Sequence, residues 1–199
     1  MKKPLYTIGI DEVGRGPIAG PVAVGAFVFL KPKAKKLFKG VKESKQLSEN
    51  KREEWFRKIL EVQKSGQADF CVTFQSEKVI DTKGLSFAIK KCLETSLNSL
   101  GIDPEKCQVL LDGGLKAPAK YGNQKTIIKG DTKEITIALA SICAKVLRDR
   151  KMRVFAKKYP NYGFDIHKGY GTRAHYEALE KYSFSGIHRK TFIHLLNGC

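Results

Sequence analysis

Apolar runs along the chain predict a five-stranded sheet. Residues 7–10 form a short, mostly β-branched run, and residues 22–30 are continuously apolar, as expected of strands covered on both faces. Residues 67–76 alternate between polar and apolar side chains with the period of a strand. Shorter runs at 109–111 and 126–128 predict two further strands. We expect the first three strands to form an antiparallel meander.

Apolar side chains spaced at three and four residues predict helices between these strands. Ser48 can cap a helix over 48–62, and a clearer helix covers 85–100 before Gly101 ends it. A long helix is predicted over 135–158. The inward face of the first helix is predicted to hold Trp55, Phe56, Ile59 and Leu60. This order of elements indicates an α/β fold with a sheet of mixed direction.

The tail of the chain has a different character. From Tyr159 it is rich in glycine, aromatic residues and cations without clean periodicity, and it predicts only short helices around 173–182 and 189–196. We therefore expect a main α/β domain over residues 1–158. Residues 159–199 should form a loop and helical appendage packed on that domain.

Charge narrows the class of partner. The chain has 199 residues and a formal net charge of +17, and a protein this basic usually binds a polyanion. The excess is concentrated in two segments, with 11 basic and 4 acidic residues in 31–58 and 12 basic and 4 acidic in 145–190. Solvated faces also carry charge runs, but solvation alone does not favour one sign so strongly.

The cysteines and the apolar content indicate the compartment. The five cysteines are widely spaced with no Cys-x-x-Cys pair, which is typical of reduced thiols. No window approaches about 18 uninterrupted apolar residues, the length that a membrane span needs. We expect a cytoplasmic protein that does not associate with a membrane.

Acidic residues recur where predicted strands end. Asp11 and Glu12 follow the first strand, Asp112 follows 109–111, and Asp131 follows the fifth strand. A few carboxylates and substrate phosphate oxygens suffice to hold Mg²⁺, and two such ions can catalyse phosphoryl displacement. The alternative is that these aspartates only cap strand ends and turns.

A glycine-rich turn follows the first two acids. Gly14 and Gly16 flank Arg15 before Pro17. Glycines permit positive φ and a close backbone approach, so a bulky ligand could lie against this turn beside the acids. A polar hairpin turn without a ligand is the alternative.

Several motifs together resemble one family. The similarity runs in the family's order from Ile8 to Phe192 and is to bacterial ribonuclease HII, the type 2 ribonucleases H. The motifs are GIDEVGRGPIAGP, SKQLS followed by KREEW, LLDGG, KGDTKEITIALASICAKVLRDR, YPNYGFDIHKGYGT and IHRKTF.

The resemblance implies a ribonuclease H-like mixed five-stranded sheet flanked by helices, with a small C-terminal helical region. It implies an endonuclease that cuts the RNA strand of RNA/DNA hybrids using Mg²⁺ or Mn²⁺. Two-metal-ion hydrolysis would leave 5′-phosphate and 3′-hydroxyl ends. The family's acidic site, both catalytic and metal-binding, corresponds to Asp11, Glu12, Asp112 and Asp131.

The resemblance also implies how ribonucleotides are recognised. The backbone of the turn Gly14–Arg15–Gly16 would contact the ribose 2′-hydroxyl, and Tyr170 would stack at the RNA-to-DNA junction. Such an enzyme should also cut duplex DNA on the 5′ side of a single ribonucleotide. Backbone contacts to the substrate are implied for Lys45, Ser141, Lys145 and Lys168.

Some residues depart from the family pattern or have no role in it. Glu43 and Thr191 replace the family's frequent aspartate and serine. The histidines lack metal-ligand spacing and are expected in loops and helices. Those histidines are His167, His175, His188 and His194. Residues 148–150 (Arg-Asp-Arg) are expected to form ion pairs on a helix surface.

Three alternative classes remain. The sister type 3 enzyme shares the acids but lacks the Gly-Arg-Gly turn and the junction tyrosine. A transposase or Holliday-junction nuclease shares the metal chemistry but not these motifs. A noncatalytic basic nucleic-acid-binding protein would explain the charge, but not four acids that repel phosphate unless a cation intervenes. We expect a monomer.

Overall fold

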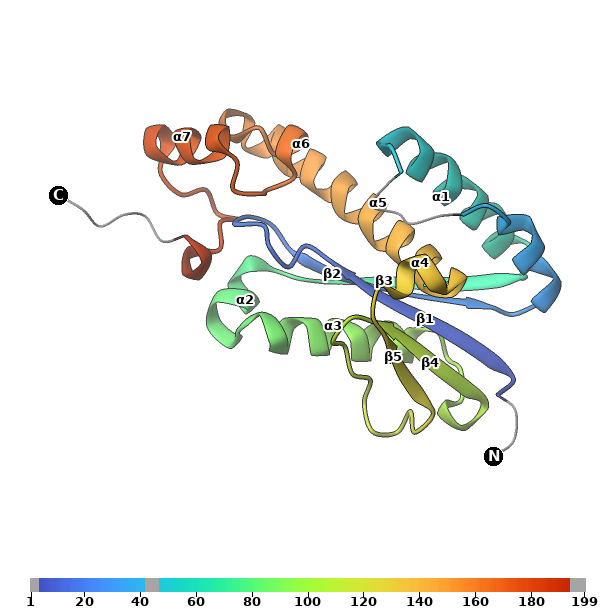
Figure 1. Cartoon of the computed structure of the whole chain (residues 1–199). Coiled ribbons are helices and arrows are strands. Elements are labelled where there is room, and N and C mark those ends of the chain that lie inside the picture. Colours follow the sequence, from blue (N-terminus) through green and yellow to red (C-terminus); the bar gives the residue numbers. More distant parts are fainter. Residues whose placement is uncertain (1–3, 42–46, 194–199) are drawn as a thin grey trace.

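The sheet is the centre of the fold. A computed structural model describes residues 4–41 and 47–193. The described strands are β1 (Tyr6–Val13), β2 (Val22–Phe29), β3 (Ala68–Gln75), β4 (Cys107–Asp112) and β5 (Gln124–Ile127). They lie in the order β3-β2-β1-β4-β5 (Figure 1). The predicted meander is confirmed, because β1 pairs antiparallel with β2 and β2 with β3, while β4 runs parallel to both β1 and β5.

Helices cover both faces of this sheet. The described α-helices are α1 (Glu49–Lys64), α2 (Glu77–Lys83), α3 (Leu85–Ser99), α4 (Gly130–Lys133), α5 (Ile135–Lys158), α6 (Phe164–His167) and α7 (Arg173–Tyr182). Short 3₁₀ helices are η1 (Pro32–Phe38), η3 (Pro104–Lys106), η4 (Pro160–Tyr162) and η5 (Lys190–Phe192). Figure 1 shows α1 and α5 on one side of the sheet and α2 and α3 on the other. The predicted mixed sheet flanked by helices is therefore confirmed.

Successive residues of β1 and β2 face opposite sides of the sheet, which divides the core into two layers. Ile8 and Ile10 pack with the apolar face of α3 in one cluster. The opposite face contacts α5, where a Cβ on Gly9 would lie 2.1 Å from Thr136 C and one on Gly25 2.4 Å from Ala140 O. Only glycine lets the α5 backbone approach so closely, and this approach places α5 beside the end of β1.

A third cluster joins the tail to the main sheet and α5. It buries Ile18, Ala19, Met152, Tyr162, Phe164, Leu179, Ile187 and Ile193. These residues come from the β1–β2 turn, the second half of α5 and the tail. The turn that follows the two acids is therefore packed against residues more than 130 positions away in the sequence.

Several local predictions need correction. Leu60 is 39% exposed, because the buried face of α1 repeats at Phe56, Ile59 and Val62. Ile128 is 75% exposed, since β5 ends one residue earlier. The helix predicted over 189–196 is only the 3₁₀ turn η5 within its described part, where Asp81 accepts the backbone N–H groups of Lys190 and Thr191. The short helices α2, α4 and α6 were not predicted.

The expectation of surface ion pairs at residues 148–150 is wrong for Arg148, and Asp149 forms its ion pair in a buried position. Arg148 is fully buried and Asp149 is 3% exposed. Arg148 donates to backbone carbonyls rather than to an acid, while Asp149 accepts from Lys145 at 2.9 Å. The tail covers this part of α5, which the helix sequence alone does not reveal. Arg150 does form an exposed ion pair, with Glu53.

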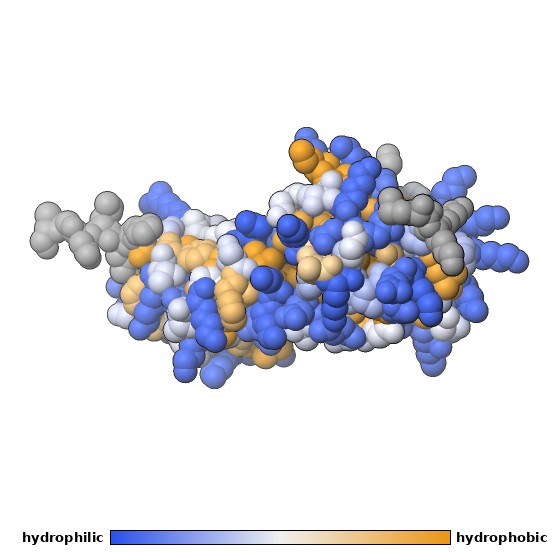
Figure 2. All heavy atoms as spheres, turned by 90° about the horizontal axis from the view of Figure 1, so that it is seen from below, coloured by the Kyte–Doolittle hydropathy of each residue, from blue (hydrophilic) through white to orange (hydrophobic). Residues whose placement is uncertain are grey.

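The surface agrees with the basic, polar composition. Figure 2 shows hydrophilic side chains over much of the face seen from below, with hydrophobic areas interrupted between them. Within residues 4–41 and 47–193, no helix has both the length and the apolar composition that a membrane crossing requires.

Candidate active site

Asp11 is the most perturbed acid of the site. It lies near the end of β1, is 2% exposed, and its Oδ1 accepts the Glu12 backbone N–H at 2.8 Å. Burial, opposed by a hydrogen bond from Ser141 and reinforced by the charges of Glu12 and Asp112, raises its pKa to about 8. A nearby cation would stabilise the ionised form of a carboxyl group in this environment.

Glu12 presents one carboxylate oxygen to the turn and buries the other. Arg15 Nη1 donates to Glu12 Oε1 at 3.1 Å. Within the described part of the chain, the buried Oε2 has no hydrogen-bond partner. Burial raises the pKa of Glu12, and the hydrogen bond and charge of Arg15 oppose that rise. A buried, unpartnered carboxylate oxygen is costly unless a ligand completes it.

Asp112 reaches the same place from the neighbouring strand. It ends β4, which runs parallel to β1, and its charge acts on both Asp11 and Glu12. Its Oδ1 accepts the Gly130 backbone N–H at 2.6 Å. Asp131 is the residue after Gly130. It is 4% exposed and lies in the first turn of α4. The hydrogen bond to Gly130 therefore ties the third and fourth predicted acids to one another.

These acids suit a divalent cation, although they do not form a closed cage. Among the residues that the structure describes, no group of three or more His, Cys, Asp or Glu side chains is arranged to hold a metal ion. Crowded carboxylates repel one another in the absence of a cation, so they do not converge by themselves. The raised pKa of Asp11 and the orphaned Glu12 oxygen fit Mg²⁺ or Mn²⁺, and magnesium retains several waters beside few carboxylates.

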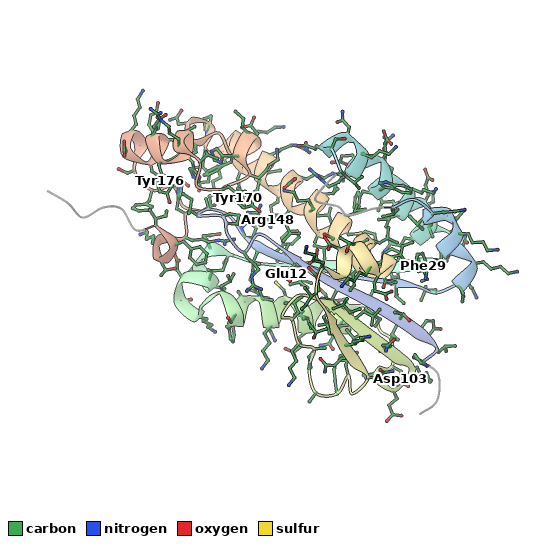
Figure 3. All side chains as sticks on the ribbon, viewed as in Figure 1. Glu12, Phe29, Asp103, Arg148, Tyr170 and Tyr176 are labelled. Carbon is green, nitrogen blue, oxygen red and sulfur yellow. The ribbon has the colours of Figure 1, made fainter. Side chains whose placement is uncertain are left out.

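A pocket of about 350 Å³ joins the acids to the glycine-rich turn. It is formed by β1, the turn, α5, α1 and the tail. Its lining residues are Asp11, Glu12, Val13, Gly14, Arg15, Gly16, Arg52, Ser141, Lys145 and Tyr170. Figure 3 shows Tyr170, Arg148 and Glu12 following one another from the C-terminal region toward the sheet. The structure therefore brings most of the predicted site residues into one place.

Some predicted residues lie elsewhere. Asp112, Asp131 and Lys168 are not among the residues that line the pocket. The Lys168 side chain is 11% exposed, and its Nζ contacts Asp165 O and lies 3.6 Å from Glu49 Oε2. Lys45 lies outside the described residues. Val13 and Arg52 line the pocket but were not predicted, although Arg52 belongs to the motif KREEW.

Two buried arginines stabilise the turn through hydrogen bonds to backbone carbonyls, and neither was predicted from the sequence. Arg148 donates to the carbonyls of Pro21 and Lys168 at 2.9 and 3.1 Å. Arg189 is fully buried and donates to three more carbonyls of the β1–β2 connection, at 2.7–3.0 Å. Burial lowers the pKa of Arg189 to about 9. Their positions in the motifs near residues 150 and 189 were the only sequence signal.

Solved structures identify the class of protein. The chain superimposes on the crystal structure of ribonuclease H2 from Pyrococcus horikoshii OT3 with a TM-score of 0.77 at 29% identity, covering 94% of this chain and 93% of the other. Bst-RNase HIII in complex with Mn²⁺ gives a TM-score of 0.65 at 21% identity, covering 94% and 67%, which shows the fold alone. The fold is that of a ribonuclease H.

Sequence comparison defines the family more narrowly. Residues 8–195 match the family model for Ribonuclease HII. Ribonuclease HII of Clostridium beijerinckii is 46% identical over 189 residues, covering 94% of this chain and 67% of the relative. The chain belongs to the Ribonuclease HII family, so the resemblance is confirmed. It is a divalent-metal-dependent hydrolase that cleaves the RNA strand of RNA/DNA hybrids.

Proposed function

We propose that this ribonuclease also cuts duplex DNA at a single embedded ribonucleotide, on its 5′ side. The observation that supports this is the juxtaposition of the turn and the tyrosine. A Cβ on Gly16 would lie 3.9 Å from Tyr170 Cε1, so the ring stands in van der Waals range of the turn. Both line the pocket that contains Asp11 and Glu12.

The turn supplies the preference for RNA. Gly14, with a φ of +94°, shapes the turn, and the exposed Gly16 leaves backbone groups that no side chain of its own covers. Backbone N–H and C=O groups can contact a 2′-hydroxyl, which both donates and accepts. Tyr170 is 43% exposed beside the turn, where its ring can pack on the sugar of the next nucleotide. A deoxyribose fits there with less crowding, so one ribose followed by DNA suffices.

The acids then act on the phosphate next to that ribose. We propose Asp11, Glu12, Asp112 and Asp131 as the catalytic and metal-binding residues. Divalent ions bound to them would activate water and stabilise the leaving oxygen, giving a 5′-phosphate and a 3′-hydroxyl. The Ser141 hydrogen bond favours the ionised form of Asp11. Because only Val13 separates Glu12 from the turn, recognition of the ribose also orients the scissile phosphate.

The remaining assignments concern binding and organisation. We propose Mg²⁺ as the usual ion, with Mn²⁺ able to replace it. Lys145, at the pocket wall, would contact the substrate backbone, as would Lys45, whereas Lys168 lies outside the lining and its Nζ already contacts Asp165 O. We also propose that residues 159–199 form an appendage of a catalytic domain over 1–158, and that the protein acts as a monomer in the cytoplasm.

The test uses three labelled substrates. These are a DNA duplex with one ribonucleotide, a continuous RNA/DNA hybrid and an all-DNA duplex, each incubated with Mg²⁺. We expect cleavage of the first two, with the ribonucleotide at the 5′ end of the product. Tyr170→Ala should lower single-ribonucleotide cleavage about tenfold or more. Tyr182→Ala, which removes a similarly exposed ring outside the pocket, is the control. Cleavage of the hybrid alone by the unaltered enzyme would overturn the proposal.

A further inference from the structure

One segment of the tail, residues 187–189, connects the turn to Tyr170. It pairs with the end of the β1–β2 turn through backbone hydrogen bonds from Gly20 N to Ile187 O and from Arg189 N to Ile18 O, each of 2.8 Å. Ala19 and His188 form the bridge between them. The segment therefore has a fixed register on the turn, although neither His188 nor Arg189 lines the pocket.

Arg189 binds the turn through its side chain. Its guanidinium donates to Gly14 O at 2.7 Å, Arg15 O at 3.0 Å and Gly20 O at 2.8 Å. A planar guanidinium with several donors fixes three carbonyls at once, which a lysine cannot do. These carbonyls belong to the backbone that carries Gly14 and Arg15, so Arg189 sets the shape of the turn.

His188 reaches toward Tyr170 on the other side. The Ser185 backbone N–H donates to His188 Nδ1 at 2.8 Å, so this nitrogen is an acceptor and the proton of neutral His188 is on Nε2. His188 Nε2 lies 3.0 Å from His175 Nε2, and His175 Nδ1 lies 2.8 Å from Tyr170 O. His188 therefore donates to His175, which donates in turn to the Tyr170 carbonyl.

Both histidines are buried, so this chain is well defined. His175 is fully buried and His188 is 3% exposed. Protonating either ring would place two N–H groups opposite one another or remove the acceptor for Ser185. Burial lowers the pKa of each to about 4, in agreement with this geometry. The hydrogen-bond directions are thus fixed near neutral pH.

We propose that His188 and Arg189 are positioning residues that set the spacing between the ribose-contacting turn and Tyr170, and with it the cleavage of single ribonucleotides. This rests on the proposed function of the turn and the tyrosine. Arg189 fixes the turn and His188 fixes the tyrosine through His175. Because His188 and Arg189 are adjacent in the chain, the turn and Tyr170 can move little relative to one another. A displacement of about 1 Å in such a site can cost up to about 100-fold in rate.

Two substitutions at His188 separate its contacts. His188→Asn places an amide oxygen near Nδ1 and keeps an acceptor for Ser185, but it cannot reach His175. His188→Gln places an amide N–H near Nε2 and can reach it. We expect kcat for the single-ribonucleotide duplex to fall about tenfold in His188→Asn and within about threefold in His188→Gln. Hybrid cleavage should change by less than about threefold in both. Glu180→Gln, on the exposed face of the helix that carries His175, is the control.

A double-mutant cycle tests whether His188 acts through Tyr170. In a Tyr170→Ala background, His188→Asn should have no further effect on single-ribonucleotide cleavage. Multiplicative effects of the two changes would overturn the proposal while leaving the proposed function intact. If the unaltered enzyme does not cut this substrate, the proposed function itself is wrong. Should His188→Asn fail to fold, His175→Gln takes its place, because it can meet His188 but has no donor at the Nδ1 position.

Arg189→Lys tests the other half of the segment with the charge retained. We expect the affinity for the single-ribonucleotide duplex, measured in EDTA, to fall about tenfold toward that for all-DNA duplex. General destabilisation would lower binding of both duplexes alike. An unchanged ratio of the two affinities would therefore contradict the positioning role of Arg189.

Discussion

The guanidinium of Arg148 lies directly against Gly14. A Cβ on Gly14 would stand 2.4 Å from Arg148 Nε and 2.9 Å from Pro21 O. Arg148 cannot easily move, because it is fully buried and donates to Pro21 O and Lys168 O. The turn therefore packs at Gly14 directly on the Arg148 side chain of α5. This packing leaves less space for a side chain at Gly14 than at Gly16.

Gly14 and Gly16 should consequently respond differently to alanine. Gly14→Ala adds a clash to a φ of +94°, and we expect it to lower the free energy of unfolding by about 2 kcal/mol or more. Gly16→Ala meets only Tyr170 Cε1 at 3.9 Å and should fold normally while weakening ribonucleotide cleavage. Urea unfolding of both variants checks this. Equal stability of the two would contradict it.

Asp112→Asn should abolish cleavage with little effect on the fold. The Asn side-chain oxygen can still accept the Gly130 backbone N–H, but the neutral amide is a poor ligand for a divalent cation. We expect activity with Mg²⁺ to fall at least about 100-fold, and hybrid binding in EDTA to stay within about threefold. Asp103→Asn is a matched control at the other end of β4, since Asp103 also accepts a backbone N–H. Near-normal cleavage by Asp112→Asn would reject the assignment.

The main elements of this fold could be predicted because their signals are local. The predicted bounds of α5 match the structure, and the meander followed from three apolar runs near one another in sequence. The acids were found because each lies at or shortly after the end of an apolar run, although Asp11 and Glu12 are still within β1. Arg148 and Arg189 could not be found in this way, since most of their partners are backbone carbonyls about 130–175 residues away. Charged residues without acidic partners look like surface residues in a sequence.

The metal-free enzyme should become more stable when Asp11 is neutralised. The folded protein keeps a proton on Asp11 up to about pH 8, whereas the unfolded chain releases it near pH 3.8. Stability attributable to Asp11 therefore falls as pH rises through this window. Asp11→Asn removes the loss, so its melting temperature in EDTA should exceed that of the unaltered protein increasingly from pH 5 to pH 8. We expect a gain of at least about 1 kcal/mol at pH 8.

The control for Asp11 is an exposed acid on α3. Glu94→Gln should show no such growth with pH, since Glu94 is exposed and pairs only weakly with Lys91 at 3.5 Å. Mg²⁺ should reduce the advantage of Asp11→Asn, because a cation favours the ionised carboxylate of the unaltered protein. An advantage independent of pH would contradict the assigned cause.

Lys145 and Lys168 should differ in their contribution to substrate binding. Lys145 lines the pocket, whereas Lys168 does not and its Nζ already contacts Asp165 O. Each phosphate contact contributes about −0.9 to the slope of log affinity against log salt concentration. We expect Lys145→Gln to flatten the slope by about 0.9 and Lys168→Gln to leave it unchanged, in anisotropy titrations with EDTA. Glutamine can still hydrogen bond to Asp149, which limits structural effects at Lys145. Equal slopes for the two variants would contradict this distinction.

The buried His175–His188 pair should make the protein less stable in acid. Burial lowers both pKa values to about 4, from the 6.5 of an unperturbed histidine, while the backbone carbonyl of Tyr170 partly opposes the shift at His175. The nearby His167 ring, stacked on His175 at 4.3 Å between centroids, adds to the cost of a positive charge there.

Between about pH 6.5 and pH 4 the unfolded chain binds protons that the folded chain does not, so stability falls as pH decreases. We expect a loss of roughly 2 kcal/mol or more for the pair between pH 7 and pH 5, measured by urea unfolding. Asp11 acts in the opposite direction over this range, so the comparison is made with His188→Gln, in which one titrating ring is absent. Between pH 7 and pH 5 the unaltered protein should lose about 1 kcal/mol or more of stability relative to this variant, and an equal change in both proteins would show that the pair does not control it.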